Sequence, residues 1–107
     1  MSSFLLTNKS LRHLGLSNNK ISGEDFENLS NSVRNNKYLL SLDLKWNELG
    51  TKGGMTLKRA LDGNDTLIYL DVNGNNIPED VFDDIEEKIK MNYRKNPLPR
   101  DEILGQD

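Results

Sequence analysis

The sequence lacks most of the residue types on which enzyme chemistry depends. It contains no cysteine and a single histidine, His13, so it offers neither a disulfide framework nor the clustered ligands of a zinc site. It also has no glycine-rich phosphate loop and no pair of metal-ligand motifs. We therefore predict that the protein is not an enzyme and has no catalytic residue, no metal and no cofactor.

Long apolar runs and an excess of positive charge are missing as well. No apolar run approaches the length that crosses a membrane, and the first residues lack the basic leader of a signal peptide. The net charge is −3 with both signs mixed along the chain, which leaves no basic stripe for nucleic acid. Together with the absence of cysteine, these features predict a cytoplasmic protein that binds other proteins, with no membrane and no nucleic acid as partners.

One sequence motif, in contrast, occurs three times at a constant interval of 28 residues. The copies start near Leu11, Leu39 and Leu67, and each reads L-x-x-L-x-L-x-x-N-x-[IL]. Apolar side chains alternate within each copy, which predicts one short strand per repeat with its apolar face in the core. The side chains predicted to point inward are Leu14 and Leu16, Leu42 and Leu44, and Leu70 and Val72.

A second pattern lies between the strands and has the spacing of a helix. Its apolar positions are Phe26, Leu29 and Val33, then Gly54, Leu57 and Leu61, then Phe82, Ile85 and Ile89. Each repeat is therefore predicted to be strand, turn and helix. We also expect Gly50, Gly53 and Gly54, at the entry of the middle helix, to allow close packing between Phe26 and Phe82 of the flanking repeats.

These patterns predict an α/β fold, a short solenoid of about three units with a parallel sheet on the concave side and helices on the convex side. The domain is expected over residues 1–95, and its last helix, with a charged outer face, is expected to act as a cap. Residues 1–10 read as the end of an earlier helix beside an open N-terminal sheet edge. Residues 96–107 contain two prolines and no period, and are predicted to form an extended tail that docks on a partner.

The asparagines that follow the strands recur with the same period and are predicted to be structural. An amide side chain after each strand can bond backbone groups of neighbouring turns that would otherwise be buried unpaired. The predicted ladder is Asn19, Asn47 and Asn75, and a second series in register before the strands is Asn8, Asn36 and Asn64.

The alternate strand positions predict a surface that contacts other proteins. The residues expected on the concave face are His13, Gly15 and Ser17, then Ser41, Asp43 and Lys45, then Tyr69, Asp71 and Asn73. Trp46 is expected at the rim, and aromatic side chains beside charged ones are enriched at interface hot spots. The alternative for Trp46 is that its ring lies flat over its own turn. His13 is interpreted as an exposed contact residue.

The pattern resembles the leucine-rich repeat, and its 28-residue unit resembles the ribonuclease-inhibitor-like class, whose members are horseshoes that bind proteins. The segments Leu42–Gly50 and Leu70–Val81 also look like the closing repeats in the family of leucine-rich repeat-containing protein 45, linkers of the centrosome and ciliary base. Axonemal repeat subunits are an equally good match.

This resemblance implies a small structural adaptor in a microtubule-based assembly such as a centriole, basal body or ciliary axoneme. Its partners would be subunits of a large cytoskeletal complex, contacted by the concave face, the open N-terminal edge and the tail. The alternatives are a soluble regulator of a small GTPase or other enzyme, and a fragment of a longer repeat protein.

Overall fold

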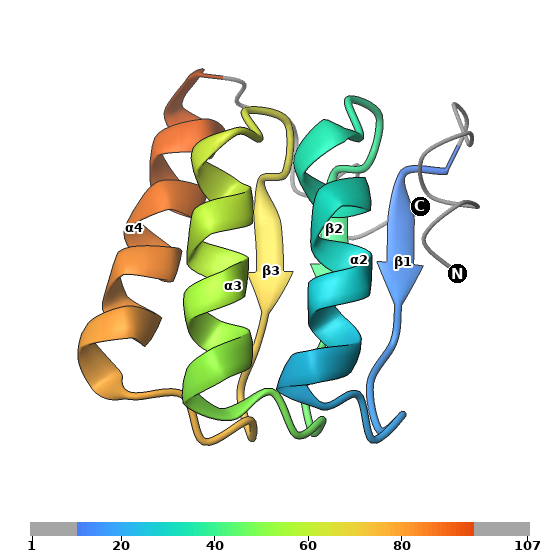
Figure 1. Ribbon diagram of the computed structural model, residues 1–107. Helices are drawn as coiled ribbons and strands as arrows, with labels where there is room; N and C mark the ends of the chain where they lie inside the picture. The colour runs from blue at the N-terminus through green and yellow to red at the C-terminus, as the bar shows by residue number, and fades with distance from the viewer. Residues whose placement is uncertain (1–10, 96–107) are drawn as a thin grey trace.

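Strands and helices alternate along the chain in the computed structural model, which describes residues 11–95. The elements are β1 (His13–Gly15), α2 (Gly23–Asn35), β2 (Ser41–Asp43), α3 (Gly50–Asp62), β3 (Tyr69–Asp71) and α4 (Glu79–Lys95) (Figure 1). This arrangement confirms the predicted α/β repeat fold. The predictions for residues 1–10 and 96–107 lie outside the described residues.

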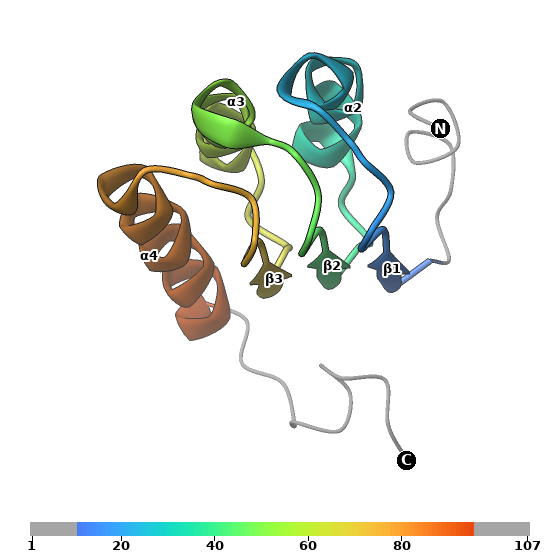
Figure 2. The same cartoon turned by 90° about the horizontal axis from the view of Figure 1, so that it is seen from below.

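The three strands form one parallel sheet in the order β1-β2-β3. Leu14 pairs with Leu42, and Leu42 pairs with Leu70, so the sequence period and the pairing register are the same. All three helices cover one face of the sheet, and the strands form the inner layer of the curve (Figure 2). None of these helices combines the length and the apolar character that a membrane span requires.

The core lies between the sheet and the helices and consists mainly of the repeated apolar positions. Its buried side chains include Leu16, Phe26, Leu29, Val33, Leu39, Leu42, Leu44, Leu57, Leu61, Leu67, Val72 and Ile85. Leu42 on the central strand is fully buried, whereas Leu14 and Leu70 on the outer strands are only partly buried. The difference follows from the stack, because a described repeat covers Leu42 on both sides.

The glycines at the starts of α2 and α3 allow close packing between neighbouring repeats. A Cβ on Gly54 would lie within 3 Å of the Ile77 side chain, and a Cβ on Gly23 would lie 2.9 Å from the Leu49 carbonyl oxygen. The nearest atoms to these positions belong to residues other than Phe26 and Phe82, and the packing expected between those two residues stays a prediction. The glycines bring the entries of neighbouring helices together, where bulkier residues would hold them apart.

Two of the ladder asparagines join adjacent repeats. The Asn47 Oδ1 accepts from the backbone N–H groups of Asn19 (2.9 Å) and Ile21 (3.1 Å), and its Nδ2 donates to the carbonyls of Leu16 and Leu44, both at 2.8 Å. Asn75 repeats the pattern one unit later, with Nδ2 bonds to the carbonyls of Leu44 and Val72. The Asn19 side chain is exposed and donates to the Ser17 carbonyl within its own turn.

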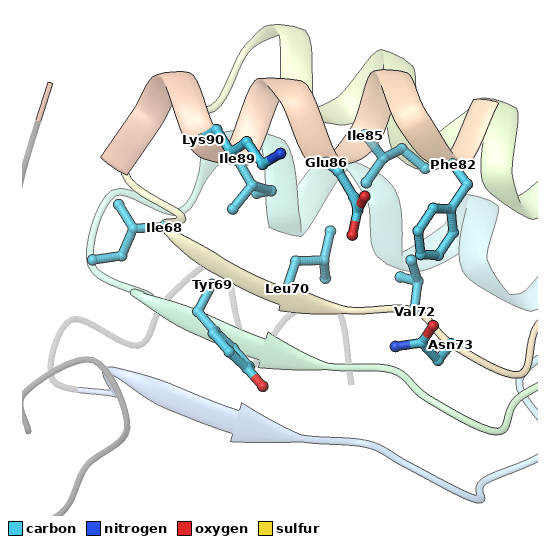
Figure 3. Close-up of a pocket in the computed structure, with 10 residues that line it drawn as sticks. All are labelled: Ile68, Tyr69, Leu70, Val72, Asn73, Phe82, Ile85, Glu86, Ile89 and Lys90. Atoms are coloured by element: carbon cyan, nitrogen blue, oxygen red, sulfur yellow. The ribbon is translucent and has the colours of Figure 1, made fainter. Parts of the chain in front are cut away.

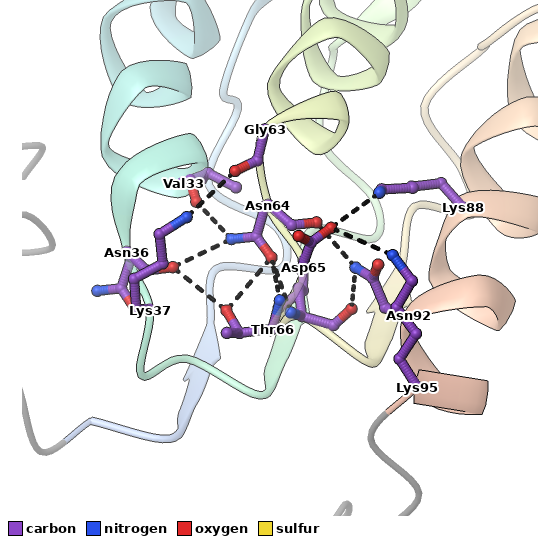
Figure 4. Close-up of polar contacts among 11 residues, drawn as sticks. Val33, Asn36, Lys37, Gly63, Asn64, Asp65, Thr66, Lys88, Asn92 and Lys95 are labelled. Atoms are coloured by element: carbon purple, nitrogen blue, oxygen red, sulfur yellow. Dashed lines mark hydrogen bonds and ion pairs between the residues drawn. The ribbon is translucent and has the colours of Figure 1, made fainter.

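A second series of asparagines joins the ends of the helices (Figure 4). The Asn64 Nδ2 donates to the Asn36 carbonyl at 3.1 Å and to the Val33 carbonyl at 2.7 Å. Asn92, fully buried in the last turn of α4, donates to the carbonyls of Asn64 (3.0 Å) and Leu67 (2.9 Å). Asn92 follows Asn64 by the same 28 residues that separate Asn36 from Asn64, and the structural role of this series was not predicted.

Candidate protein-binding surface

The open face of the sheet carries the predicted contact residues in two cross-strand rows. His13, Ser41 and Tyr69 are register partners, and Gly15, Asp43 and Asp71 form the next row. Successive side chains of a strand point to opposite faces, and Leu14, Leu42 and Leu70 pack on the helical side. The two rows therefore lie on the face opposite the helices. Ser17, Lys45 and Asn73 follow in the turns after the strands.

His13 and Ser41 form a hydrogen bond across the first two strands. The His13 Nδ1 and the Ser41 Oγ are 2.7 Å apart. A nucleophile and base pair needs a third group to orient the base, and the described residues place no carboxylate in hydrogen-bond contact with the imidazole. They also contain no cluster of potential metal ligands. The pair is best explained as a polar link that orders this part of the surface.

Lys45, in the turn after β2, forms a charged cluster with Asp43 and Asp71 of the second cross-strand row. Its Nζ lies 2.8 Å from the Asp43 Oδ2. The hydrogen bond to Asp43 and the charge of Asp43 raise the pKa of Lys45, and the charges of Asp71 and Tyr69 act in the same direction. The ammonium group therefore stays protonated, paired with Asp43 of its own repeat and attracted by Asp71 of the adjacent strand.

Both carboxylates are held by the turns that follow their strands. The Asp43 Oδ1 accepts from the Lys45 backbone N–H at 3.0 Å. The Asp71 Oδ1 accepts from the backbone N–H of Asn73 at 3.1 Å and from its Nδ2 at 2.9 Å. Such local bonds limit the positions of the carboxylates, so the cluster is ordered before any partner arrives.

Trp46 stands at the rim of this surface and packs against the next repeat. Its φ is +59° and its side chain is 59% exposed, while its backbone N–H donates to the Asn73 carbonyl at 2.9 Å. A Cβ on Gly74 would collide with the indole ring. The ring therefore lies over the turn of the third repeat, and the alternative that it lies over its own turn is wrong. Tyr69, on β3, is 39% exposed.

One feature that sequence reasoning missed is a groove between β3 and α4 (Figure 3). Its volume is about 150 Å³. The apolar lining consists of Ile68, Leu70, Val72, Phe82, Ile85 and Ile89, and polar residues Asn73, Glu86 and Lys90 also border it. Each of these apolar residues belongs to the repeat pattern or adjoins it, so sequence alone assigned most of them to a closed core.

Comparison with known proteins gives two family matches and one curated relative. A model described as Leucine Rich Repeat matches residues 10–32, and one described as Leucine Rich repeat matches residues 35–58. Protein CARMIL of Dictyostelium discoideum is 35% identical over 80 residues, covering 72% of this chain and 8% of CARMIL. The chain thus corresponds to a small part of that relative.

A solved structure shows the same fold. Leiomodin-1 Actin-Binding Site 2 matches with a TM-score of 0.68 at 22% identity, over 81% of this chain and 51% of that chain. The tropomodulin C-terminal domain of Caenorhabditis elegans has a TM-score of 0.43 at 15% identity, over 86% of this chain and 71% of that one. With the three strand-turn-helix units, the two family matches support a leucine-rich repeat protein that serves as a protein-interaction module.

Proposed function

We propose that the repeats bind a cytoskeletal protein through the concave surface around Trp46, Tyr69 and the Lys45 cluster. The observation that carries this proposal is the exposed indole of Trp46, held over Gly74 at the rim of a sheet face that also carries two ordered carboxylates, Asp43 and Asp71. Aromatic side chains on a rigid surface supply contact area at a low entropic cost, and tryptophan and tyrosine dominate interface hot spots. The site needs no bound cofactor for this role.

The charges of the surface define the chemistry of the partner. Asp43 and Asp71 carry two negative charges and Lys45 carries one positive charge, and Lys45 is already paired with Asp43. A partner that presents an arginine or lysine beside an apolar side chain would complement Asp71 and Trp46. Three strands at about 4.8 Å spacing are narrow for a standard interface of about 800 Å² per partner, so adjacent surfaces would contribute too.

Actin or an actin-bound protein is the partner to test first. The leiomodin-1 structure of the same fold is the Actin-Binding Site 2 of that protein, although a likeness of fold leaves the partner open. The resemblance to the ribonuclease-inhibitor-like class, and to leucine-rich repeat-containing protein 45, supports the same interaction role in a microtubule-based assembly such as a centriole, basal body or axoneme. These two cytoskeletal settings make different predictions for co-sedimentation.

The test is co-sedimentation of the full chain with actin filaments and, separately, with microtubules. Trp46→Ala combined with Tyr69→Ala should reduce binding to the correct filament at least about tenfold, as loss of a hot spot would. Met55→Ala on α3 is the matched control, because Met55 is an exposed apolar residue, 40% accessible, on the helical face. Unchanged binding by the double variant, with an unchanged melting temperature, would remove the concave surface from the proposal.

The alternative function, regulation of a small GTPase, has less support in the described residues. Arg12 donates from its Nη1 to the Tyr38 carbonyl at 3.2 Å, and Arg34 and Arg59 lie on helices α2 and α3. The concave rows therefore contain no arginine that could reach a bound nucleotide. Stimulated hydrolysis by the wild-type chain that is lost in Arg12→Ala would favour the regulator instead.

A further inference from the structure

Strand β3 has a free edge on the side that faces away from β2. The Asp71 carbonyl accepts from Leu44 at 2.8 Å and the Tyr69 N–H donates to the Leu40 carbonyl at 3.1 Å, so both residues face β2. Backbone groups alternate sides along a strand, which directs those of Leu70 to the other side. Within residues 11–95 no strand pairs with β3 on that side.

The groove between β3 and α4 lies along this free edge. Leu70 points from β3 toward α4, facing Ile85 and Ile89, and Glu86 and Lys90 border the opening (Figure 3). At the equivalent position of β2, Leu42 is fully buried by the repeat that follows it. The groove therefore has the form of the space that a fourth repeat would fill with an apolar side chain.

The repeat register continues toward that space beyond the third strand. Asn92 donates to the Asn64 carbonyl at 3.0 Å, as Asn64 donates to the Asn36 carbonyl at 3.1 Å. Asn92 also donates to the Leu67 carbonyl, which holds the end of α4 beside the start of β3. The chain leaves α4 at Lys95, and Leu98 follows Leu70 by 28 residues, in register with Leu42 and Leu14.

Prolines flank Leu98 on both sides. Pro97 and Pro99 take the register positions of Tyr69 and Asp71, the residues whose backbone faces the preceding strand. Proline has no N–H to donate there, so a regular ladder with β3 is incomplete. The side chain of Leu98 would then be the main attachment, with carbonyls of this segment accepting from the free edge of β3.

We propose that residues 96–100 of the tail lie along the free edge of β3 and insert Leu98 into the groove between β3 and α4. Three residues from Lys95 to Leu98 span about 10 Å of extended chain, the same number of steps as from Leu67 to Leu70. The tail would thus close the stack as a shortened fourth strand, and would keep the groove from other proteins.

The absence of cysteine allows a direct test by disulfide formation in the full chain. Leu98→Cys is combined with Glu86→Cys at the groove, with Ser41→Cys on the concave face, or with Ser30→Cys on α2. Ser30 is the matched control for Glu86, because both residues lie on helices and only Glu86 borders the groove. In dilute protein under mild oxidation, the Leu98–Glu86 pair should form its internal disulfide roughly tenfold faster than the other two, because proximity raises the effective concentration.

Equal rates for the three pairs, or a fastest reaction with Ser41→Cys, would overturn the proposal. Disulfides formed mainly between two chains would overturn it in favour of a second copy at the groove. An independent measurement uses Leu98→Asp with Leu104→Asp as its control. The first variant alone should speed amide hydrogen exchange at Leu70 and Val72, and equal exchange in both variants would contradict the proposal. Neither readout depends on the partner proposed for the concave face.

Discussion

The indole ring of Trp46 lies against the backbone of Gly74, so that the second repeat places an aromatic side chain on the turn of the third. Gly74 has a φ of +76°, a conformation that residues with a Cβ adopt at a cost. Two independent requirements therefore meet at one glycine: the backbone conformation of the turn and the space for the indole. This contact holds the most exposed aromatic residue of the described surface in place.

Gly74→Ala should destabilise the protein and displace Trp46. The positive φ alone costs roughly 1–2 kcal/mol for an L residue, and the new Cβ would collide with the ring. The measurement is chemical unfolding with tryptophan fluorescence, which reports on the single indole. Gly15→Ala is the control, because nothing lies within 4 Å of a Cβ at that position. A similar loss in both variants would contradict the role of the contact.

Asn47→Ala should unfold the stack far more readily than Asn19→Ala. Asn47 makes four hydrogen bonds to backbone groups of two repeats, and leaving buried groups unpaired costs about 1–3 kcal/mol each. Asn19 is exposed and bonds only within its own turn through its side chain, so its loss should cost about 0.5 kcal/mol or less. Thermal melts followed by circular dichroism would separate the two, and equal melting temperatures would argue against the ladder.

Leu44→Ala should cost about 2 to 5 kcal/mol, as for other fully buried leucines. Within residues 11–95 the Leu70 side chain is only partly buried beside the groove, so Leu70→Ala should be as costly only if the tail fills the groove, and a clearly smaller cost would contradict that placement of the tail. The comparison is made by urea unfolding at one temperature. If Leu70→Ala is as costly as Leu44→Ala, the groove is filled in solution, which is the result expected when the tail occupies it.

The pH dependence of stability should contain a contribution from Asp65. The hydrogen bond from Lys88 and the charge of Lys88, followed by the charge of Lys95, hold the pKa of Asp65 below its usual value. A carboxyl with a lower pKa in the folded state stabilises the fold above its unfolded pKa, and this contribution is lost as the pH falls through the folded pKa. Asp65 is exposed, so salt should weaken the effect.

The corresponding experiment compares melting temperatures of the wild type and Asp65→Asn from pH 7 down to pH 2 at low salt. The wild type should be the more stable at neutral pH, and the difference should disappear at the acid end. Asp83→Asn on the outer face of α4 serves as the control for a general change of net charge. A difference that persists at pH 2 would assign the effect to something other than the carboxylate.

The repeat period predicted most of the fold because one spacing determines both the strand pairing and the helix positions. Leu42 and Leu70 pair as their 28-residue separation requires. The extent of burial could not be predicted in the same way, since Leu42 and Leu70 have the same place in the pattern and differ only in what covers them. Sequence periodicity identifies equivalent positions, but the position of a repeat in the stack decides how deeply each is buried.

For the candidate site, the strand alternation predicted which residues lie on the open face, while their mutual contacts required the structure. Trp46 and Gly74 both have a positive φ, a conformation that the sequence does not suggest for tryptophan, so their contact was not predicted. The link between His13 and Ser41 follows from the parallel register only once the rotamers are known. The groove escaped prediction because all of its apolar residues fit a closed core.

The equality of sequence period and pairing register has a consequence for how such a chain can change in length. Asn47 and Asn75 bond the same carbonyls relative to their own repeats, and Asn64 and Asn92 bond equivalent carbonyls one repeat before. Duplicating residues 36–63 would therefore recreate the strand pairing and the asparagine bonds between neighbours, whereas the Trp46 contact would change, because the copy has Trp46 at the position of Gly74. The fold can lengthen or shorten by whole units, and a binding surface can be widened one strand at a time without redesign of the interior.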